Sequence, residues 1–156
     1  MNPATDVGKK ELATGIRNRF TEFFCDDLTD LEDLTLLAES YLENMSVPAV
    51  LLTRIVDLYC AVRTEAEHLS ADAFGHCPVY SLRTFCRALR AASRNQFGNI
   101  VRSVFEAFSM SFLTELDQKS QTIIEGMIGR YILGTNPAVV KGILSAEVTK
   151  PSPNFV

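Results

Sequence analysis

The sequence has no run of about 18 consecutive apolar residues, so it predicts no membrane-spanning helix. Residues 1–10 also have no apolar segment of the kind found in secretory signal peptides. Of the 156 residues, 47% are hydrophobic and 22% are charged, which is the balance of an ordinary globular domain. We therefore expect one intracellular domain, and its net charge of −4 argues against nucleic-acid binding by the whole surface.

Complete catalytic motifs are also missing from the sequence. There is no G-x-x-x-x-G-K-[ST] loop to bind phosphates. His68 and His76 share one segment and have no placed partner for a nucleophilic triad. The pair Asp26 and Asp27 could hold a magnesium ion, but a solvated strand end is the favoured interpretation. The sequence therefore contains no complete active site.

The four cysteines form none of the C-x-x-C pairs that are typical of zinc and redox sites. Most of them lie within apolar patterns, which predicts small, reduced core residues. His76 and Cys77, with the distant His68, make a poor zinc set, because structural zinc needs four ligands in close pairs. We therefore expect no bound metal. The cysteines are Cys25, Cys60, Cys77 and Cys86.

Apolar residues recur with helical spacing over most of the chain. We expect a short helix within residues 11–18 and a strand over Phe20–Phe24, where apolar and polar residues alternate. Further helices are predicted over residues 29–44, 48–67, 82–94, 99–116, 117–133 and 136–144. The fold class is therefore mainly α, a helical bundle with a short α/β remnant at the N-terminus.

The helix expected over residues 82–94 carries two stripes, and Ser81 is a suitable N-cap for it. One stripe is apolar and consists of Leu82, Phe85, Cys86 and Leu89. The other, which we call the arginine stripe, consists of Arg83, Arg87, Arg90 and Arg94. Four guanidinium groups on one face repel each other unless solvent, carboxylates or a polyanion neutralise them. Either the stripe is a solvated face, or one of its arginines contacts a phosphate.

Three segments resemble parts of a AAA+ ATPase module. MNPATDVGKKELATGIRNRFTEFF resembles the end of its large subdomain, and YSLRTFCRALRAA and QFGNIVRSVFEAFSMSFLTELD resemble successive helices of its lid. Together they are similar to the midasin family of dynein-related AAA+ ATPases, which act in ribosome assembly. The resemblance runs from Met1 to about Leu133. It implies a helical AAA+ lid subdomain preceded by the α/β remnant of the large subdomain.

The resemblance also implies a division of the chain. Residues 1–27 would end the large subdomain, residues 28–145 would form the lid, and residues 146–156 would link to the next module. The Walker A and Walker B segments would lie upstream of Met1, and the metal-ion-dependent adhesion domain far downstream. We therefore expect ATP and magnesium to be cofactors of the intact parent, an ATPase. This chain alone is expected to bind neither of them well and to hydrolyse no ATP.

By the same resemblance, individual residues receive roles. Asn2 stands at sensor 1, which orients the attacking water, and Arg83 stands at sensor 2, where the lid touches the γ-phosphate. Arg19 stands at the arginine finger, which acts in trans on the neighbouring module's nucleotide, with Arg17 as the alternative. A guanidinium suits both roles because it places fixed positive charge on phosphate oxygens. Ala13 departs from the family pattern, where a proline is expected.

The function implied by the resemblance is the removal of assembly factors from pre-60S ribosomal particles in the nucleus (nucleolus and nucleoplasm). The expected partners are neighbouring AAA+ modules of the same chain, the pre-60S particle and its assembly factors, with no membrane and no direct nucleic-acid contact. One alternative is a free-standing helical module that docks an acidic partner through the arginine stripe. A second is a nucleic-acid-binding module, which the net charge of −4 disfavours.

Overall fold

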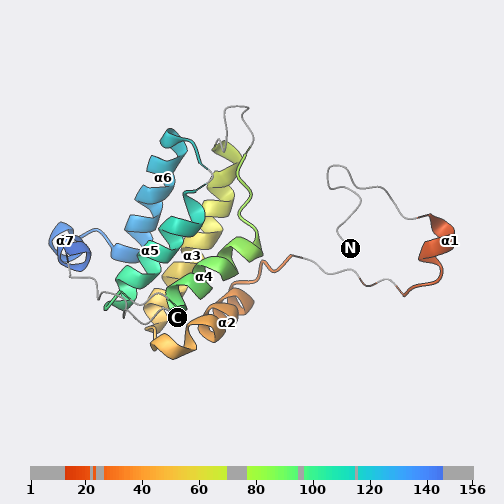
Figure 1. Ribbon diagram of the computed structural model, residues 1–156, viewed down its shortest axis with the longest axis horizontal. Coiled ribbons are helices and arrows are strands. Elements are labelled where there is room, and N and C mark those ends of the chain that lie inside the picture. The colour runs from red at the N-terminus through yellow and green to blue at the C-terminus, as the bar shows by residue number, and fades with distance from the viewer. Residues whose placement is uncertain are drawn as a thin grey trace, which may run out of the picture.

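The structure is a computed structural model that describes residues 13–21, 23, 27–69, 77–94, 97–114 and 116–145. In those residues it contains helices and no β-strand, so the mainly α prediction is confirmed (Figure 1). The elements in chain order are α1 (Thr14–Arg17), α2 (Leu31–Leu42), η1 (Glu43–Met45), α3 (Ala49–Glu65), η2 (Ala66–His68), α4 (Leu82–Arg94), α5 (Ile100–Phe112), α6 (Gln118–Ile128), η3 (Gly129–Leu133) and α7 (Pro137–Ser145).

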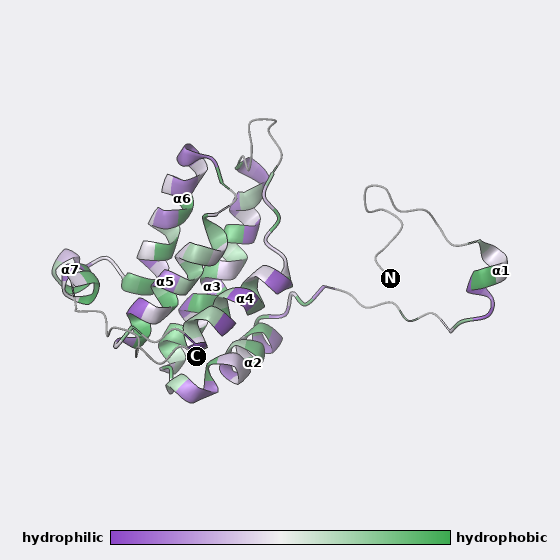
Figure 2. Ribbon diagram, viewed as in Figure 1, coloured by the Kyte–Doolittle hydropathy of each residue, from purple (hydrophilic) through white to green (hydrophobic). Residues whose placement is uncertain are grey.

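The bundle is built around α3, α4 and α5. Helix α4 packs against both α5 and α2, while η3, the turn that continues α6, packs against α3 and α5. Figure 2 shows that the helices of the bundle carry both hydrophobic and hydrophilic residues. Helix α7 touches α5 and η3 but buries none of its residues. Helix α1 also buries no residue and stands apart from the bundle in Figure 1.

The strand expected over Phe20–Phe24 does not form at the residues described there. Phe20, Thr21 and Phe23 lie outside any strand, and the two phenylalanines are 70% and 86% exposed. A single strand cannot satisfy its backbone hydrogen bonds without a neighbouring strand, and alternation of residue types does not provide one. In the part of the chain that the structure describes, the N-terminal remnant is therefore the single turn of α1.

Helix α2 begins one residue later than its sequence indicates. The pattern Thr29-Asp30-Leu31-Glu32 predicts a capping box with Thr29 as N-cap. In the structure Asp30 is the N-cap, and its Oδ1 accepts a hydrogen bond of 2.8 Å from the backbone N–H of Glu32. A carboxylate at this position also interacts favourably with the positive end of the helix dipole, which explains why Asp30 serves better than Thr29.

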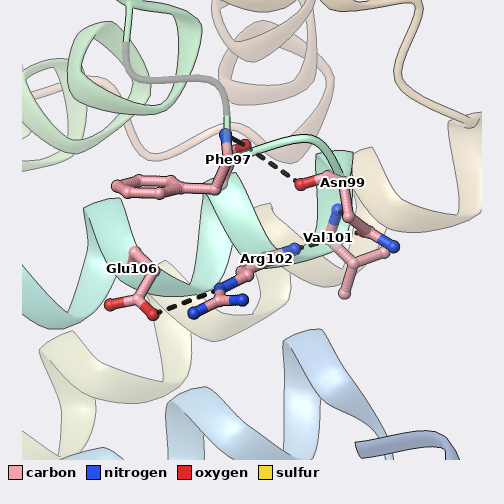
Figure 3. A network of polar contacts seen from close by, with 6 residues as sticks. Phe97, Asn99, Val101, Arg102 and Glu106 are labelled. Carbon is pink, nitrogen blue, oxygen red and sulfur yellow. Dashed lines mark hydrogen bonds and ion pairs between the residues drawn. The ribbon is translucent and has the colours of Figure 1, made fainter. Parts of the chain in front are cut away.

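A small polar network fixes the start of α5 (Figure 3). The side chain of Asn99 is the N-cap, and its Oδ1 accepts hydrogen bonds from the backbone N–H groups of Val101 (2.8 Å) and Arg102 (3.3 Å). The hydroxyl of Ser103 donates to the carbonyl oxygen of Asn99 (3.0 Å) and accepts from the backbone N–H of Phe97 (2.8 Å). The buried Ser103 is thereby satisfied, and the segment that enters α5 is held in one conformation.

Five aromatic rings form a continuous series through the core. The rings of Tyr59 and Phe85 stack with centroids 4.4 Å apart, and Phe85 meets Phe108 edge-on at 6.1 Å. Phe108 stacks on Phe112 at 5.3 Å, and Phe112 stacks on Tyr80 at 4.9 Å. These contacts, which we call the aromatic series, join α3, α4 and α5 and the segment before α4. They fix which face of α4 is buried.

The last long helix changes its hydrogen-bonding pattern at Gly129. The sequence predicts one helix over residues 117–133, but the structure has α-helix to Ile128 and a π-helical turn from Gly129 to Leu133. The backbone N–H of Gly134 donates to the carbonyl of Gly129 (3.1 Å), which is the i→i−5 bond of a π-helix. Gly134 then ends the helix with φ of 85°, as the sequence predicts for a C-terminal glycine.

Because the hydroxyl of Tyr59 is buried, the bundle is expected to lose stability at alkaline pH. Burial raises the pKa of this hydroxyl above its usual value of 10.0, and its O–H donates only a long hydrogen bond of 3.5 Å to the carbonyl of Tyr80. The folded state therefore holds the proton more tightly than the unfolded state. The stability that this contributes is fully present below pH 10 and is lost as the pH rises above that value.

We expect Tyr59→Phe to reduce the loss of stability at alkaline pH and to change stability little at pH 7. The check is the urea midpoint of wild type and variant at pH 7, 9.5 and 11. Burial also raises the pKa of the Cys60 thiol, but both proteins keep Cys60, so its titration cancels in the comparison. Equal alkaline losses in the two proteins would contradict the prediction.

Candidate functional site

The structure places the arginine stripe on the solvent side of α4. All four of its arginines are exposed. Their sequence spacing confines them to roughly 60° of the helix circumference. The opposite side faces the core and is formed by Phe85, Ala88, Leu89 and Ala92, each with 0% exposure. The stripe is therefore a fixed row of positive charge, because the aromatic series and its neighbours determine the rotation of α4.

Of the arginine stripe, Arg90 has a defined contact with another helix. Its guanidinium carbon lies 5.8 Å from the centroid of the Tyr41 ring on α2, which is a cation–π geometry. No carboxylate among the described residues forms an ion pair with any arginine of the stripe. The charge of the stripe is therefore not neutralised within the described part of the fold.

Arg83 lies in the first turn of α4 and is exposed. That turn is regular, because the backbone N–H groups of Thr84 and Phe85 donate to the carbonyl oxygen of Ser81 (2.9 and 3.2 Å). The buried ring of Phe85 anchors the same turn in the core. Arg83 therefore combines a fixed backbone with a guanidinium that faces solvent, which is what contact with an external phosphate requires.

The structure does not bring Arg83 together with the other predicted site residues. Arg17 is the last residue of α1 and is exposed. Arg19 follows in the next turn, where its backbone N–H donates to the carbonyl of Ile16 (3.0 Å), and it is also exposed. Figure 1 places α1 away from α4, so these arginines share no site with Arg83. The predicted sensor 1 residue, Asn2, lies outside the described residues.

A small cavity of about 130 Å³ adjoins the arginine stripe. The chain segments around it are residues 78–80, the first two turns of α4 and the last turn of α5 with Thr114. The Tyr80 hydroxyl donates a 2.9 Å hydrogen bond to the carbonyl of Phe112, which ties the first of these segments to α5. Arg87 lines the cavity, and exposed apolar side chains, Val79 (82%) and Met110 (49%), lie at its edge. Positive charge and apolar surface thus meet at one place.

The described residues contain no group of three or more histidine, cysteine or acidic side chains that could hold a metal ion. The exposed Asp27 forms an ion pair of 3.8 Å with the half-buried Arg63, and Asp26 lies outside the described residues. None of the described helices has both the length and the apolar character that a membrane span needs.

The cysteine prediction holds only in part. Cys60 and Cys86 are free thiols at half-buried positions beside the core, as expected. Cys77 is exposed, contrary to the expectation of a core residue, and its Sγ donates to the carbonyl of Glu67 at 3.5 Å. It lies at the surface because the segment before α4 buries Pro78 and Tyr80 instead. Cys25 lies outside the described residues.

Comparison with protein families identifies the bundle. A family model described as the midasin AAA lid domain matches residues 33–135. The chain belongs to the midasin family. It is 42% identical to midasin of Dictyostelium discoideum over 134 residues, which is 85% of this chain and 2% of that protein. It is 32% identical to midasin of Giardia intestinalis over 145 residues, which is 87% of this chain and 3% of that protein. No solved structure matches.

The matched range corresponds to the bundle, from α2 to the end of η3, and we call it the midasin lid. It includes the arginine stripe and the cavity, whereas Arg17, Arg19 and α7 lie outside it. The chain spans only 2–3% of the length of these midasin relatives. The division at residues 27 and 145 inferred from the sequence stays a prediction.

Two polar contacts of the midasin lid were not predicted from the sequence. Arg102 and Glu106 on α5 approach to 3.7 Å with side-chain exposures of 12% and 34% (Figure 3). Their i, i+4 spacing is a signal that could have identified this pair. The contact of Arg90 with Tyr41 has no such signal, because it depends on how α2 packs against α4.

Proposed function

We propose that this chain is the lid of one AAA+ module in a midasin-like ATPase. The parent hydrolyses ATP with the help of magnesium and uses the energy to remove assembly factors from pre-60S ribosomal particles. It does so in the nucleolus and nucleoplasm, in contact with neighbouring AAA+ modules of the same chain. Two things support the proposal: the family match over residues 33–135 and the geometry of α4.

The position of Arg83 is the observation that carries the proposal. Its backbone belongs to the regular first turn of a helix that is anchored in the core, while its side chain is exposed. Phosphoryl transfer is accelerated when positive charge is already placed where negative charge develops on the phosphate oxygens. A guanidinium at this position can contact the γ-phosphate of the module's own nucleotide and couple its loss to movement of the lid.

The roles proposed for Asn2 and Arg19 concern other steps. Asn2 would orient the attacking water as sensor 1. Arg19 would act as the arginine finger on the nucleotide of the neighbouring module, with Arg17 as the alternative. The separation of α1 from α4 is compatible with two arginines that serve two different nucleotides. By the family resemblance, the magnesium ligands would lie with the Walker A and Walker B segments of the module.

The test is Arg83→Ala in the intact parent protein. We expect ATP hydrolysis at this module to fall by about 10²-fold or more, the usual cost of removing one preorganised positive or hydrogen-bonding group from a transition state. The other modules should carry Walker A substitutions so that they contribute no turnover. The matched control is Arg54→Ala, an exposed arginine on α3 outside the proposed site. Wild-type turnover by Arg83→Ala would contradict the proposal.

A further inference from the structure

We propose that the arginine stripe beyond Arg83, together with the adjoining cavity, is a docking surface for an acidic peptide segment of a partner protein. The residues involved are Arg87, Arg90 and Arg94 and the cavity edge formed by Val79 and Met110. This inference does not depend on the ATP-related role of Arg83, because it uses different side chains and a different ligand.

The positive charge of this surface favours the binding of an external anion. Its arginines are exposed, and no described carboxylate neutralises them. They follow one another along about 10 Å of the helix axis from Arg87 to Arg94. The whole chain carries a net charge of −4, so the stripe is a local reversal of the overall sign. Such a reversal attracts an acidic partner in one place and orients it along α4.

The contact between Arg90 and Tyr41 prepares the surface for binding. With its carbon 5.8 Å from the ring centroid, the guanidinium is held over the aromatic face. The Arg90 side chain is also exposed, so its N–H groups can reach a carboxylate from solvent. An arginine that is already ordered loses less side-chain entropy when it binds. Arg90 is therefore the residue of the stripe that is best prepared for an ion pair.

The cavity adds a contact point next to the charges whose lining is both polar and apolar. It has a volume of about 130 Å³, and Arg87 and Thr84 line it together with Tyr80, Met110 and Phe112. At its edge Val79 is 82% exposed, although apolar, and Met110 is 49% exposed. An apolar side chain placed here would cover surface that now meets water. The combination fits a peptide that carries one apolar residue beside several acidic ones.

The same features favour a peptide over a nucleic acid. Single strands are held mainly by base stacking on exposed aromatic rings together with backbone charge. The aromatic rings described beside the stripe are poorly placed for such stacking. Tyr41 is half-buried and lies under Arg90, while Tyr80 and Phe112 in the cavity lining are buried. The net charge of −4 further opposes a long polyanion that would extend beyond the stripe.

The spacing of the stripe defines a probe. An acidic helix that lies antiparallel to α4 would meet Arg94, Arg90 and Arg87 with carboxylates at positions i, i+4 and i+7. Its next turn would reach the cavity, so an apolar residue belongs at i+10. The probe is a fluorescein-labelled alanine-based peptide of 16 residues with three glutamates and one leucine at these positions. A second peptide replaces the glutamates by glutamine.

The experiment is a fluorescence anisotropy titration of the probe with the 156-residue chain at low and physiological salt. We expect binding that weakens with added salt and is lost with the glutamine peptide. The variant R87E/R90E/R94E should bind about tenfold or more weakly. The variant R87K/R90K/R94K keeps the charge but not the guanidinium groups, so it should bind more weakly than wild type and more tightly than the glutamate variant. The charge-matched control R54E/R130E/K141E changes three exposed residues outside the stripe and should keep wild-type affinity. Thermal unfolding of each variant checks that it folds.

Three outcomes would overturn the proposal. The probe could fail to bind the wild-type chain. The control variant could lose as much affinity as the stripe variant, which would mean that net charge alone is sensed. A single-stranded RNA of ten nucleotides could bind more tightly than the probe and depend on the same arginines, which would identify a nucleic-acid surface instead.

Discussion

Replacing Phe108 by alanine is expected to lower the free energy of unfolding by about 3–5 kcal/mol, a large part of the stability of an ordinary domain. Phe108 is 0% exposed and occupies the middle of the aromatic series, 6.1 Å from the ring of Phe85 and 5.3 Å from that of Phe112. Its removal leaves a cavity where α4 and α5 meet and ends the continuity of the series.

The measurement is urea unfolding followed by far-UV circular dichroism at pH 7. Phe105→Ala is the matched control, because it makes the same change on the same helix at a half-buried position. We expect the control to cost clearly less, since Phe105 packs on the core from its margin. If both variants lost the same stability, the aromatic series would not be the part of the core that holds α4 and α5 together.

Replacing Arg19 by alanine in the intact parent is expected to lower ATP hydrolysis at the neighbouring module by about 10³-fold or more. The reason is the proposed role in trans: an arginine finger neutralises charge that develops only in the transition state. Arg19 is exposed and lies beside α1, outside the bundle. Its side chain is therefore not enclosed by the described part of the lid.

Arg17→Ala is the control for this prediction, because Arg17 lies two residues away on α1 and is the alternative finger. The turnover of each variant is compared in a parent whose neighbouring module alone can hydrolyse ATP. Removing the Walker A lysine of that module as well should add little to the loss in the Arg19 variant, because both act on one site. A larger loss in Arg17→Ala would transfer the role to Arg17.

Much of the helical architecture could be predicted from the sequence, because helical spacing of apolar residues follows directly from which face is buried. In α3 the apolar residues at helical spacing are all buried, namely Leu51, Leu52, Ile55, Leu58, Tyr59 and Val62. The prediction was less accurate where the pattern is ambiguous. Ile123 and Ile124 are adjacent and equally apolar, yet Ile123 is 47% exposed while Ile124 is fully buried. The strand over Phe20–Phe24 was predicted from alternation, which carries no information about a pairing partner.

In the candidate site, too, some features could be predicted from the sequence and others could not. The exposure of the arginine stripe follows from helix geometry and could be predicted from sequence spacing. The cation–π contact of Arg90 could not, since Tyr41 lies on α2 and only packing brings the two together. The cavity depends likewise on the approach of residues 78–80 to the end of α5. A single sequence does not reveal which segments far apart in the chain come into contact.

The aromatic series has a mechanical consequence for the lid. Rings from α3, α4 and α5 contact one another with centroids 4.4 to 6.1 Å apart, which leaves little room for these helices to slide past one another. The bundle is therefore expected to move as one rigid body, with Arg83 in the first turn of α4 and Arg94 as its last residue. Each degree of tilt at the first turn moves the last by about 0.3 Å over the length between them. We therefore expect that a change in the proposed phosphate contact of Arg83 would displace the far end of α4 with little rearrangement inside the lid.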